Sequence, residues 1–359
     1  MDEAASGETE GATARPTLAA VAARAGVSAS TASLAFSGSG PVSAATRERV
    51  LAAAADLDYA GPDPTARSLR RGRSGVIGVV TEERLADTFR DPMNLALLDG
   101  IGEALGDERI GLLVIPLAGD GTDLASASMD AAILLGCSTD LESSVAALGR
   151  RRMPIVAIEA PPMAGVIAVD LDNRAATRAG AAHLRELGHE RVALVTLPLD
   201  SAHTRGPLTP DRERASTSHS ANERIHGARA VFPAAGGMSA GGSTIDEGLL
   251  AGRALLDVPV ATRPTAIIAQ SDLLAVGVIR AAEELGLDVP GDLSVLGFDG
   301  IRLEGATTHV LTTLVQPAVE KGRAAAAAVL AGLAGRPADR VELHAELRVG
   351  STTAPPRTL

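Results

Sequence analysis

A cluster of arginines is the first feature of this sequence with recognisable chemistry. The segment GPDPTARSLRRGRSG, residues 61–75, carries a single leucine among Arg67, Arg70, Arg71 and Arg73. Guanidinium groups at this density suit phosphate ligands, and each phosphate contact makes binding more sensitive to salt. Leu69 would be exposed on a short helix here, and such an apolar side chain can wedge between base pairs in a minor groove. The alternative is a basic linker with an incidental leucine.

Motifs for catalysis or metal binding are weak by comparison. GMSAG, residues 237–241, matches the Gly-x-Ser-x-Gly turn of serine hydrolases, but that turn needs a strand before it and a helix after it, and the flanking PAAG and GGST favour loop. His183 and His189 have no third metal ligand near them. The sequence has no Gly-Lys-Ser/Thr phosphate loop, and Cys137 is its only cysteine. We therefore expect no enzyme activity, no metal and no cofactor.

Three short helices are predicted ahead of the arginines. Thr17, Ser28 and Ser43 are suitable N-caps for helices over 18–25, 29–36 and 44–57. Their spacing predicts a miniature core of apolar side chains: Leu18, Val21, Ala22, Ala25, Ala32, Ala35, Phe36, Val50, Leu51, Ala54, Leu57 and Tyr59.

The first two helices are joined by a turn at Gly26, a residue suited to a left-handed backbone. Two helices joined in this way form a helix-turn-helix. The second helix would expose Ser30, Thr31 and Ser33, small polar side chains that can reach base edges in a major groove. An ordinary helical bundle that uses the same caps is the alternative interpretation.

Charge is unevenly distributed along the chain. The 359 residues contain 33 lysines and arginines and 44 acids, for a formal net charge of -11. Residues 1–14 carry -4, residues 15–73 carry +4 and residues 74–359 carry -11. The total argues against a generic nucleic-acid-binding protein, but the partition separates a basic module from an acidic body. Lys321 is the only lysine, which we attribute to compositional bias.

The acidic body is predicted to be α/β. Helix-like stretches at 95–105, 174–188 and 273–286 alternate with apolar runs of strand length at 75–81, 110–116, 131–135, 154–158, 191–197, 265–270 and 293–298. This alternation favours two doubly wound subdomains with parallel sheets. Residues 199–222 are polar and interrupted by proline, so we expect a mobile loop there, and 234–243 also look like loop.

No apolar run approaches the ~18 residues that a membrane span requires. The N-terminal MDEAASGETEGATA lacks the basic and apolar regions of a signal peptide. We expect a cytoplasmic protein that does not contact a membrane.

Taken together, the motifs resemble those of the lactose-repressor/galactose-repressor (LacI/GalR) family of transcription regulators. The similarity extends from about Pro16 to Thr352, and its motifs occur in family order. They are TLAAVAARAGVSASTAS (17–33), VSAATRERV (42–50), ARSL (66–69), VDLDN (169–173), HLRELGH (183–189), ANERIHG (221–227), AQSDLLAVG (269–277), GLDVPGDLSVLGFD (286–299) and LTTLVQP (311–317).

The resemblance implies a domain order. An acidic tail (1–14) would precede a helix-turn-helix headpiece (15–62), a hinge helix (63–74) and a periplasmic-binding-protein-like core (75–350), with a tail at 351–359. The core would comprise one subdomain of 75–170 and 318–342 and a second of 171–317 and 343–350.

The resemblance also implies a homodimer that binds a near-palindromic operator in double-stranded DNA. Ala29, Ser30 and Ser33 would contact bases, and Leu69 would be the minor-groove wedge. Phosphate contacts would come from Thr17, Ser28, Thr31, Arg47 and Arg67. Leu34 departs from the pattern, because many relatives have a basic residue there.

A small-molecule effector would bind between the two core subdomains. The resemblance assigns this role to Phe89, Glu159, Arg224, Ser271, Asp299 and Gln316. Against it, Arg224 and Asp299 could simply pair with each other or with backbone, and Asp272 is more readily a helix N-cap than a ligand contact.

With only Phe89, Phe232 and Phe298 as aromatic side chains, the body has few groups to stack on a ligand. A sugar-like effector is therefore the first expectation and a nucleobase the second. We expect a repressor, and a stand-alone sugar-binding protein of the periplasmic type is the alternative.

Overall fold

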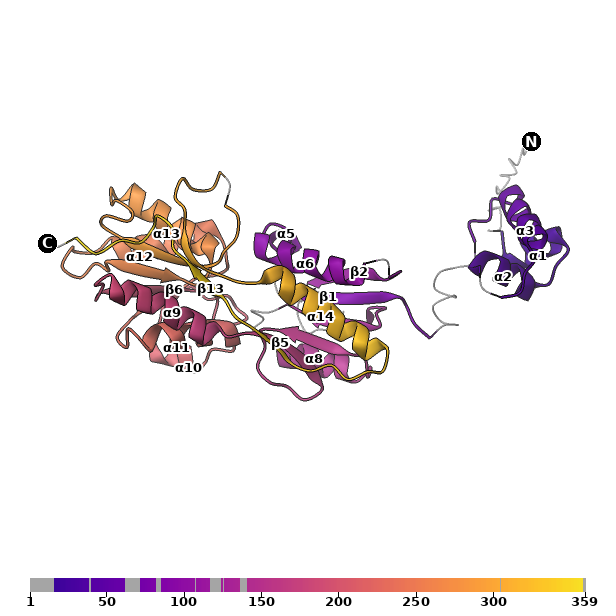
Figure 1. Cartoon of the computed structure of the whole chain (residues 1–359), viewed down its shortest axis with the longest axis horizontal. Coiled ribbons are helices and arrows are strands. Elements are labelled where there is room, and N and C mark those ends of the chain that lie inside the picture. Colours follow the sequence, from indigo (N-terminus) through magenta and orange to yellow (C-terminus); the bar gives the residue numbers. More distant parts are fainter. Residues whose placement is uncertain are drawn as a thin grey trace, which may run out of the picture. The chain divides into compact units, whose positions relative to one another are not determined.

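The computed structural model describes residues 16–38, 40–61, 72–81, 85–106, 108–116, 124, 126–135, 141–303 and 305–357. The chain forms two compact units, residues 1–74 and 75–359 (Figure 1). In the described part, no single helix is long and apolar enough to cross a membrane.

The first unit contains the three predicted helices, α1 (Leu18–Ala25), α2 (Ala29–Ser37) and α3 (Ala44–Asp56). The predicted caps are confirmed: the side chains of Thr17, Ser28 and Ser43 accept hydrogen bonds from backbone amides in the first turn of each helix. Gly26 ends α1 in the left-handed region, with φ 66°. The expected helix-turn-helix follows from these local features.

A small apolar core holds the three helices together. Val21, Ala32 and Val50 are fully buried, and Tyr59 packs edge-on against Phe36 with ring centroids 5.6 Å apart. The prediction that Leu51 faces inward was wrong, since 45% of it is exposed. The inward face of α3 is carried instead by Val50, Ala53 and Ala54.

The body contains two sheets, each covered by helices on both faces (Figure 1). The first sheet is entirely parallel, in the order β12-β5-β4-β3-β1-β2. Its strands are β1 (Val76–Thr81), β2 (Gly111–Pro116), β3 (Ala131–Leu134), β4 (Ile155–Ile158), β5 (Val166–Leu171) and β12 (Val341–Leu343).

The second sheet has the order β13-β11-β10-β9-β6-β8-β7, with antiparallel pairing only at its two edges, β11 with β13 and β8 with β7. Its strands are β6 (Val192–Thr196), β7 (Gly206–Pro207), β8 (Gly237–Ser239), β9 (Ala266–Ala269), β10 (Ser294–Asp299), β11 (Thr312–Val315) and β13 (Glu346–Arg348).

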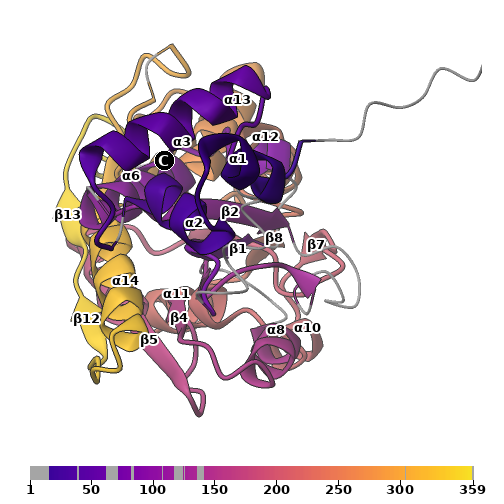
Figure 2. The same cartoon turned by 90° about the vertical axis from the view of Figure 1, so that its right-hand side faces the viewer.

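The helices of the first subdomain are α5 (Leu85–Thr88), α6 (Pro92–Leu105), α8 (Leu141–Gly149) and α14 (Ala318–Leu333). Helices α6 and α14 pack together, and in Figure 2 they are visible above and along the side of the first sheet. Alternate residues of β3 enter separate apolar clusters, Ile133 with α14 and Ala132 with α8, as expected for a strand buried on both faces.

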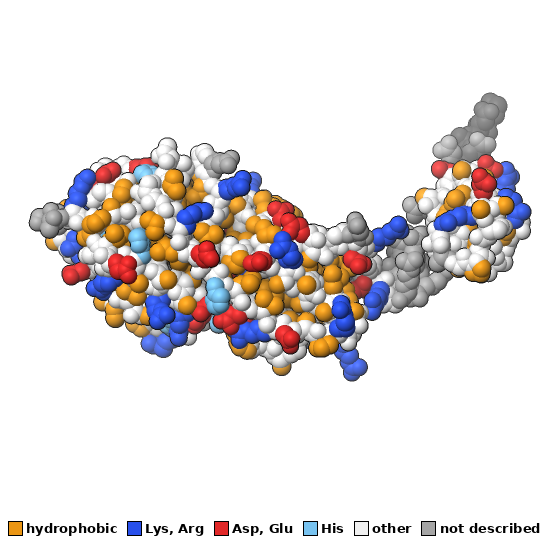
Figure 3. All heavy atoms as spheres, viewed as in Figure 1, with side chains coloured by type: hydrophobic (Ala, Val, Ile, Leu, Met, Phe, Trp, Pro, Cys, Tyr) orange, Lys and Arg blue, Asp and Glu red, His pale blue; other side chains and the backbone are white. Residues whose placement is uncertain are grey.

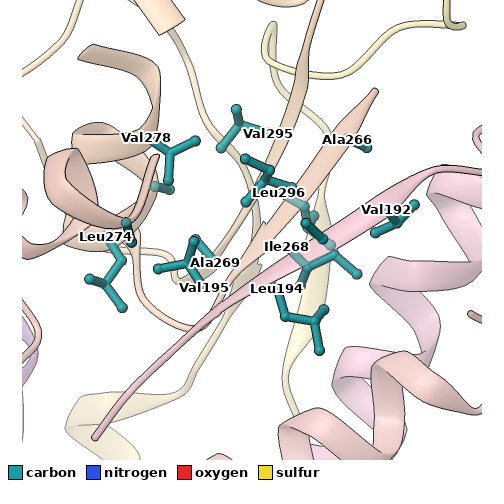
Figure 4. Close-up of a cluster of buried hydrophobic side chains, with 14 of the residues drawn as sticks. Val192, Leu194, Val195, Ala266, Ile268, Ala269, Leu274, Val278, Val295 and Leu296 are labelled. Atoms are coloured by element: carbon teal, nitrogen blue, oxygen red, sulfur yellow. The ribbon is translucent and has the colours of Figure 1, made fainter. Parts of the chain in front are cut away.

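The helices of the second subdomain are α9 (Asn173–Glu186), α10 (Pro210–Arg214), α11 (His219–Arg229), α12 (Ile245–Leu256) and α13 (Asp272–Glu284). Helices α9 and α11 pack as one pair and α12 and α13 as another. Figure 4 shows the core between them, where Leu194, Ile268 and Leu296 project from three neighbouring strands. The predicted α/β architecture is confirmed.

The chain passes between the two sheets three times. It leaves the first sheet after β5, returns from β11 into α14, and crosses again from β12 to β13. Each crossing brings residues from both sheets into one place, and these crossings frame the polar site described below.

Glycines allow α6 and α14 to approach closely. A Cβ atom added at Gly100 would lie 1.9 Å from the backbone oxygen of Val319, whereas one at Gly102 would meet nothing within 4 Å. We expect Gly100→Ala to lower the free energy of unfolding by about 1–3 kcal/mol because it overpacks this contact. Gly102→Ala is the matched control and should be neutral or stabilising by up to about 1 kcal/mol. Urea unfolding of both variants measures this, and equal stabilities would contradict it.

Two loop predictions were wrong. Residues 199–222 contain β7, α10 and the start of α11, and Arg205 from this segment donates to both carboxylate oxygens of Glu247 on α12. Residues 234–243 contain β8, which pairs with β6. Both segments are rich in polar or small residues and lack an apolar pattern. Their structure is determined by strand pairing and side-chain bonds with neighbouring elements.

The predicted C-terminal tail also packs on the body. Thr352 is fully buried; its hydroxyl accepts from the amide of Thr312 and donates to the carbonyl of Val295. His189 lies 2.9 Å from the carbonyl oxygen of Ala354. The described part of this segment, through residue 357, therefore adds to the edge of the second subdomain.

Candidate functional site

Polar side chains that follow strand ends in both sheets meet at one place. Glu159 follows β4 of the first sheet. Gln270, Asp299 and Gln316 stand at the ends of β9, β10 and β11 of the second sheet. All four are buried, at 3–8% exposure. In open α/β sheets, ligands bind at the carboxyl ends of strands, so this is the position expected for a binding site.

Arg224 from α11 joins the two sheets. Its side chain is 2% exposed, and Nε donates to Oδ1 of Asn173 at 2.8 Å. Nη1 donates to the carbonyl oxygen of Gln270 at 2.5 Å, and Nη2 lies 3.4 Å from Oε2 of Glu159. Its guanidinium carbon lies 3.7 Å from the ring centroid of Phe298. Its ion pair is thus made across the subdomains with Glu159, rather than with Asp299.

Lys321 is the member of this cluster that the sequence did not predict. It lies in the first turn of α14 and is fully buried. Its ammonium group donates to Oε1 of Glu159 and to Oε1 of Gln316. The interpretation of the single lysine as compositional bias alone missed this role. A signal existed, because it lies five residues beyond Gln316 in a chain that otherwise uses arginine.

Asp299 is held by the crossover after β11. Nε2 of Gln316 donates to its Oδ1 at 2.6 Å, and the backbone amide of Gln316 donates to its carbonyl at 3.0 Å. Asp299 has φ 122°, a backbone conformation that residues other than glycine rarely adopt. Strained backbone of this kind is concentrated at functional positions.

The electrostatics of the cluster differ between its two acids. Burial alone would raise the pKa of Glu159, but the charges of Lys321 and Arg224 outweigh it and hold that pKa at about 2. Burial raises the pKa of Asp299, as do the nearby charges of Asp272 and Asp91, against the opposing charge of Arg224. Asp91, the N-cap of α6, is therefore a further residue of this region that the sequence did not indicate.

In the described part of the chain, two other predicted effector residues are not part of this hydrogen-bond network. Ser271 is the N-cap of α13, where its hydroxyl accepts from the amide of Leu274 at 3.2 Å and from the hydroxyl of Ser243 at 2.9 Å. Asp272 was expected in that capping role and instead is the first helical residue. Phe89 follows α5 and is 50% exposed. Neither residue has a bond to the cluster among those that the described residues show.

Asp272 accepts three hydrogen bonds in a fully buried position. Its donors are the amides of Gly300 and Ile301, at 2.8 and 3.0 Å, and the hydroxyl of Thr313 at 2.6 Å. Burial raises its pKa to about 6 in spite of these bonds. The carboxyl thus supports the loop that follows Asp299.

This raised pKa predicts a pH dependence. The folded chain keeps the proton of Asp272 up to about pH 6, whereas an unfolded aspartate loses it near pH 4. Its contribution to stability is therefore present at low pH and is lost as the pH rises from about 4 to about 6. Asp272→Asn should remove this loss, so its stability relative to the natural chain should rise by on the order of 2 kcal/mol across that window. Urea unfolding at several pH values tests this, and parallel curves would contradict it.

Three of the headpiece residues predicted to bind DNA stand together at the start of α2. Ser28 lies 2.8 Å, oxygen to oxygen, from both Ser30 and Thr31, and Ser28, Ala29 and Ser30 are exposed. Thr17 and Arg47 are also exposed, and Ser33 and Thr31 are partly exposed. The guanidinium of Arg47 lies beside Gly38, at the C-terminus of α2. Arg67 and Leu69 lie outside the described residues.

Ser239 in the GMSAG motif ends strand β8, so the expectation that no strand precedes it was wrong. Its hydroxyl is buried and has no hydrogen-bond partner in the described part of the chain, and helix α12 begins only at Ile245. A hydrolase turn places its serine exposed at a sharp strand–helix junction, unlike this arrangement. The described residues contain no group of three His, Cys, Asp or Glu side chains suited to a metal ion.

Two family models match the chain. One, described as bacterial regulatory proteins of the lacI family, matches residues 17–61. The other, a periplasmic binding protein-like domain, matches residues 181–353. The first covers the three headpiece helices and the second most of the body beyond the first sheet.

Two transcriptional regulators are similar to this chain along nearly their whole length. An HTH-type transcriptional regulator of Mycolicibacterium smegmatis is 34% identical over 87% of this chain and 89% of its own. The HTH-type transcriptional repressor CytR of Escherichia coli is 29% identical over 89% and 90%.

Solved structures extend this similarity to the fold. A LacI-family transcriptional regulator from Corynebacterium glutamicum has a TM-score of 0.72 at 27% identity and covers 94% of this chain and 98% of its own. A complex of the regulator CelR with cellobiose has a TM-score of 0.66 at 27% identity and covers 94% and 100%.

Proposed function

The chain belongs to the LacI family of bacterial regulatory proteins, and we propose that it is a homodimeric repressor controlled by a small molecule at the buried cluster. In this proposal the headpiece binds a near-palindromic operator, and effector binding alters operator affinity. The observation that carries it is the joining of a capped helix-turn-helix to a body whose two subdomains meet in charged, buried side chains. Such a protein works in the cytoplasm, where its DNA lies.

DNA contact is proposed for the exposed start of α2. The small hydroxyl groups of Ser28, Ser30 and Thr31 stand together there, at the end of a helix that suits the major groove. Figure 3 shows acidic and basic side chains interspersed on the visible face of the body. A surface of this kind offers phosphate little attraction, which restricts DNA contact to the headpiece and hinge.

A homodimer is supported by an apolar strand edge that has no partner strand among the described residues. Strand β2 lies at the edge of the first sheet and exposes Leu112 and Leu113, while Leu95 on α6 is 41% exposed. An exposed edge with apolar side chains is prone to associate, and natural proteins usually cover it. We propose that a second copy covers this side of the first subdomain. A twofold dimer of this kind would present two headpieces to the two halves of a near-palindromic site.

A sugar-like effector is favoured over a nucleobase. Phe298 is buried beneath Arg224, and Phe232 is buried with Arg185 stacked 4.4 Å above it. Of the three phenylalanines of the body, only Phe89 retains an exposed face for stacking. The charged and amide groups of the cluster suit hydroxyl groups, and a similar regulator was solved with cellobiose.

The proposed control is a change in how the subdomains pack. Arg224, Glu159 and Asn173 bind one another, and the contacts that Glu159 makes with the other two residues link the subdomains. An effector that replaces some of these bonds would favour a different arrangement of the subdomains, and so a different spacing of the hinges in the dimer.

Selection of DNA sites from a random library, followed by fluorescence anisotropy with and without sugars, tests this function. We expect a near-palindromic site bound by two chains and a change in affinity with at least one neutral sugar. Absence of any preferred site would instead support the stand-alone sugar-binding protein.

A further inference from the structure

The only lysine of the chain is one of its most deeply buried side chains. Lys321 is 0% exposed, and its ammonium group contacts Glu159 and Gln316. The other residues counted as lysine or arginine in the sequence are all arginines. A compact ammonium group fits a fully enclosed position between two acceptors, whereas the larger planar guanidinium would need more space.

This ion pair is costly to bury. Removing two charges from water is repaid only partly by their attraction, and apolar replacements for buried ion pairs are often equally stable or more so. Stability therefore does not explain why Lys321 and Glu159 are charged. Both residues belong to the polar cluster, since Gln316 connects Lys321 to Asp299 and Glu159 contacts Arg224, and this position explains their charges.

The carboxylate of Glu159 contacts both cations of the cluster, Lys321 and Arg224. One carboxylate oxygen contacts Lys321, and the other accepts from Asn173 at 2.7 Å and contacts Arg224. Its low pKa keeps it ionised at neutral pH. Asp272 and Asp91, the nearby groups whose charges raise the pKa of Asp299, are acids.

An anionic ligand would therefore find its binding place already filled. A phosphate or carboxylate group would have to displace Glu159 from both cations, or lie beside it and be repelled. A hydroxyl group meets neither difficulty, because it donates to a carboxylate and accepts from an ammonium or guanidinium group. The buried polar atoms that lack a partner in the described residues belong to Asp170, Ser216, Ser218 and Ser239. At Glu159, Lys321 and Arg224 a ligand must therefore match groups that already have partners.

We propose that the effector is an uncharged polyhydroxyl compound and that Glu159 is the residue that excludes anions, through its contacts with Lys321 and Arg224. The inference rests on the proposed function in taking this cluster as the effector site. It identifies Glu159 and Lys321 as specificity-determining residues and removes sugar phosphates and sugar acids from the class of effectors.

Glu159→Gln tests the proposal, because glutamine keeps the shape of the side chain and removes its charge. Thermal unfolding of the full chain is measured with 10 mM inorganic phosphate and with sodium chloride of equal ionic strength. We expect the variant to unfold at a lower temperature than the natural chain in chloride, and phosphate to raise that temperature by about 5 °C as it takes the vacated place. For the natural chain, phosphate and chloride should give the same temperature.

Two controls make the result specific. The double variant Glu159→Gln with Lys321→Met lacks one of the two cations, so the gain from phosphate should largely disappear. Glu342→Gln removes an acid that pairs with Arg340 on the surface, with 51% of the glutamate exposed, and should gain nothing from phosphate. A variant that gains no phosphate binding, or an equal gain in the double variant, would overturn the proposal.

The natural chain still tests the proposal if Glu159→Gln does not fold. Stabilisation of the natural chain by phosphate beyond the chloride control, if it is lost in Lys321→Met, would show that Glu159 does not exclude anions from this cluster. Operator binding is measured separately and without effector. If the natural chain prefers no operator site, the proposed function is refuted. The phosphate experiment would still decide the role of Glu159.

Discussion

Arg224→Met is expected to abolish the response to effector while operator binding without effector is retained. Arg224 makes charge-assisted hydrogen bonds to Asn173 of its own subdomain and to Glu159 of the other subdomain. Hydrogen bonds that involve a charged group contribute about 1.5–3 kcal/mol each. If an effector uses two of these donors, their removal should weaken its binding by about 100-fold or more.

Methionine keeps the aliphatic part of the side chain against Phe298, which limits the loss of stability. Arg229→Met is the matched control, since Arg229 lies on the same helix and pairs with Glu213 away from the cluster. Anisotropy titrations of operator, with increasing sugar, measure both properties. An unchanged sugar response in Arg224→Met, or its equal loss in Arg229→Met, would place the effector elsewhere.

Leu69→Ala is expected to weaken operator binding by about 100-fold and to leave non-specific DNA binding almost unchanged. The proposed wedge unstacks a base step, and the bend that this allows is available only on a suitable sequence. Non-specific binding depends on phosphate contacts, which the neighbouring arginines keep. Specific and non-specific affinities, measured at the same salt concentration, test the difference.

Arg67→Ala provides the complementary control for the hinge. Loss of one phosphate contact should weaken both kinds of binding and reduce the salt dependence of the affinity by about one unit of slope. If Leu69→Ala weakens both kinds of binding equally, the leucine is not a wedge.

The headpiece could be predicted from sequence because its determinants are local. Each cap lies three residues from the amide that it binds, and Gly26 supplies the turn by itself. The central strands were equally predictable, since they are apolar on both faces. Strand β8 was missed because three residues with a glycine carry no pattern, and its position depends on pairing with β6.

The cluster was only partly predictable. Motif positions indicated Glu159, Arg224, Asp299 and Gln316, which the structure brings together. Lys321 was missed because its partner Glu159 is 162 residues away in the chain, and a single lysine in an alanine-rich helix is normally solvated. The sequence predicted Asp272, rather than Ser271, as the N-cap of α13. The two assignments differ by one residue in the start of the helix, which a sequence pattern does not resolve.

The packing of the C-terminal segment has a consequence for synthesis of the protein on the ribosome. The first sheet needs α14 and β12, and the second needs β13 and Thr352, so neither sheet is complete until residues 318–352 have been translated. The three headpiece helices, by contrast, pack on one another within residues 18–59 and can fold as soon as this segment emerges. The two sheets of the body are completed only after most of their other strands have been synthesised. A stop codon at or before position 341 would remove β12 from the first sheet and β13 from the second.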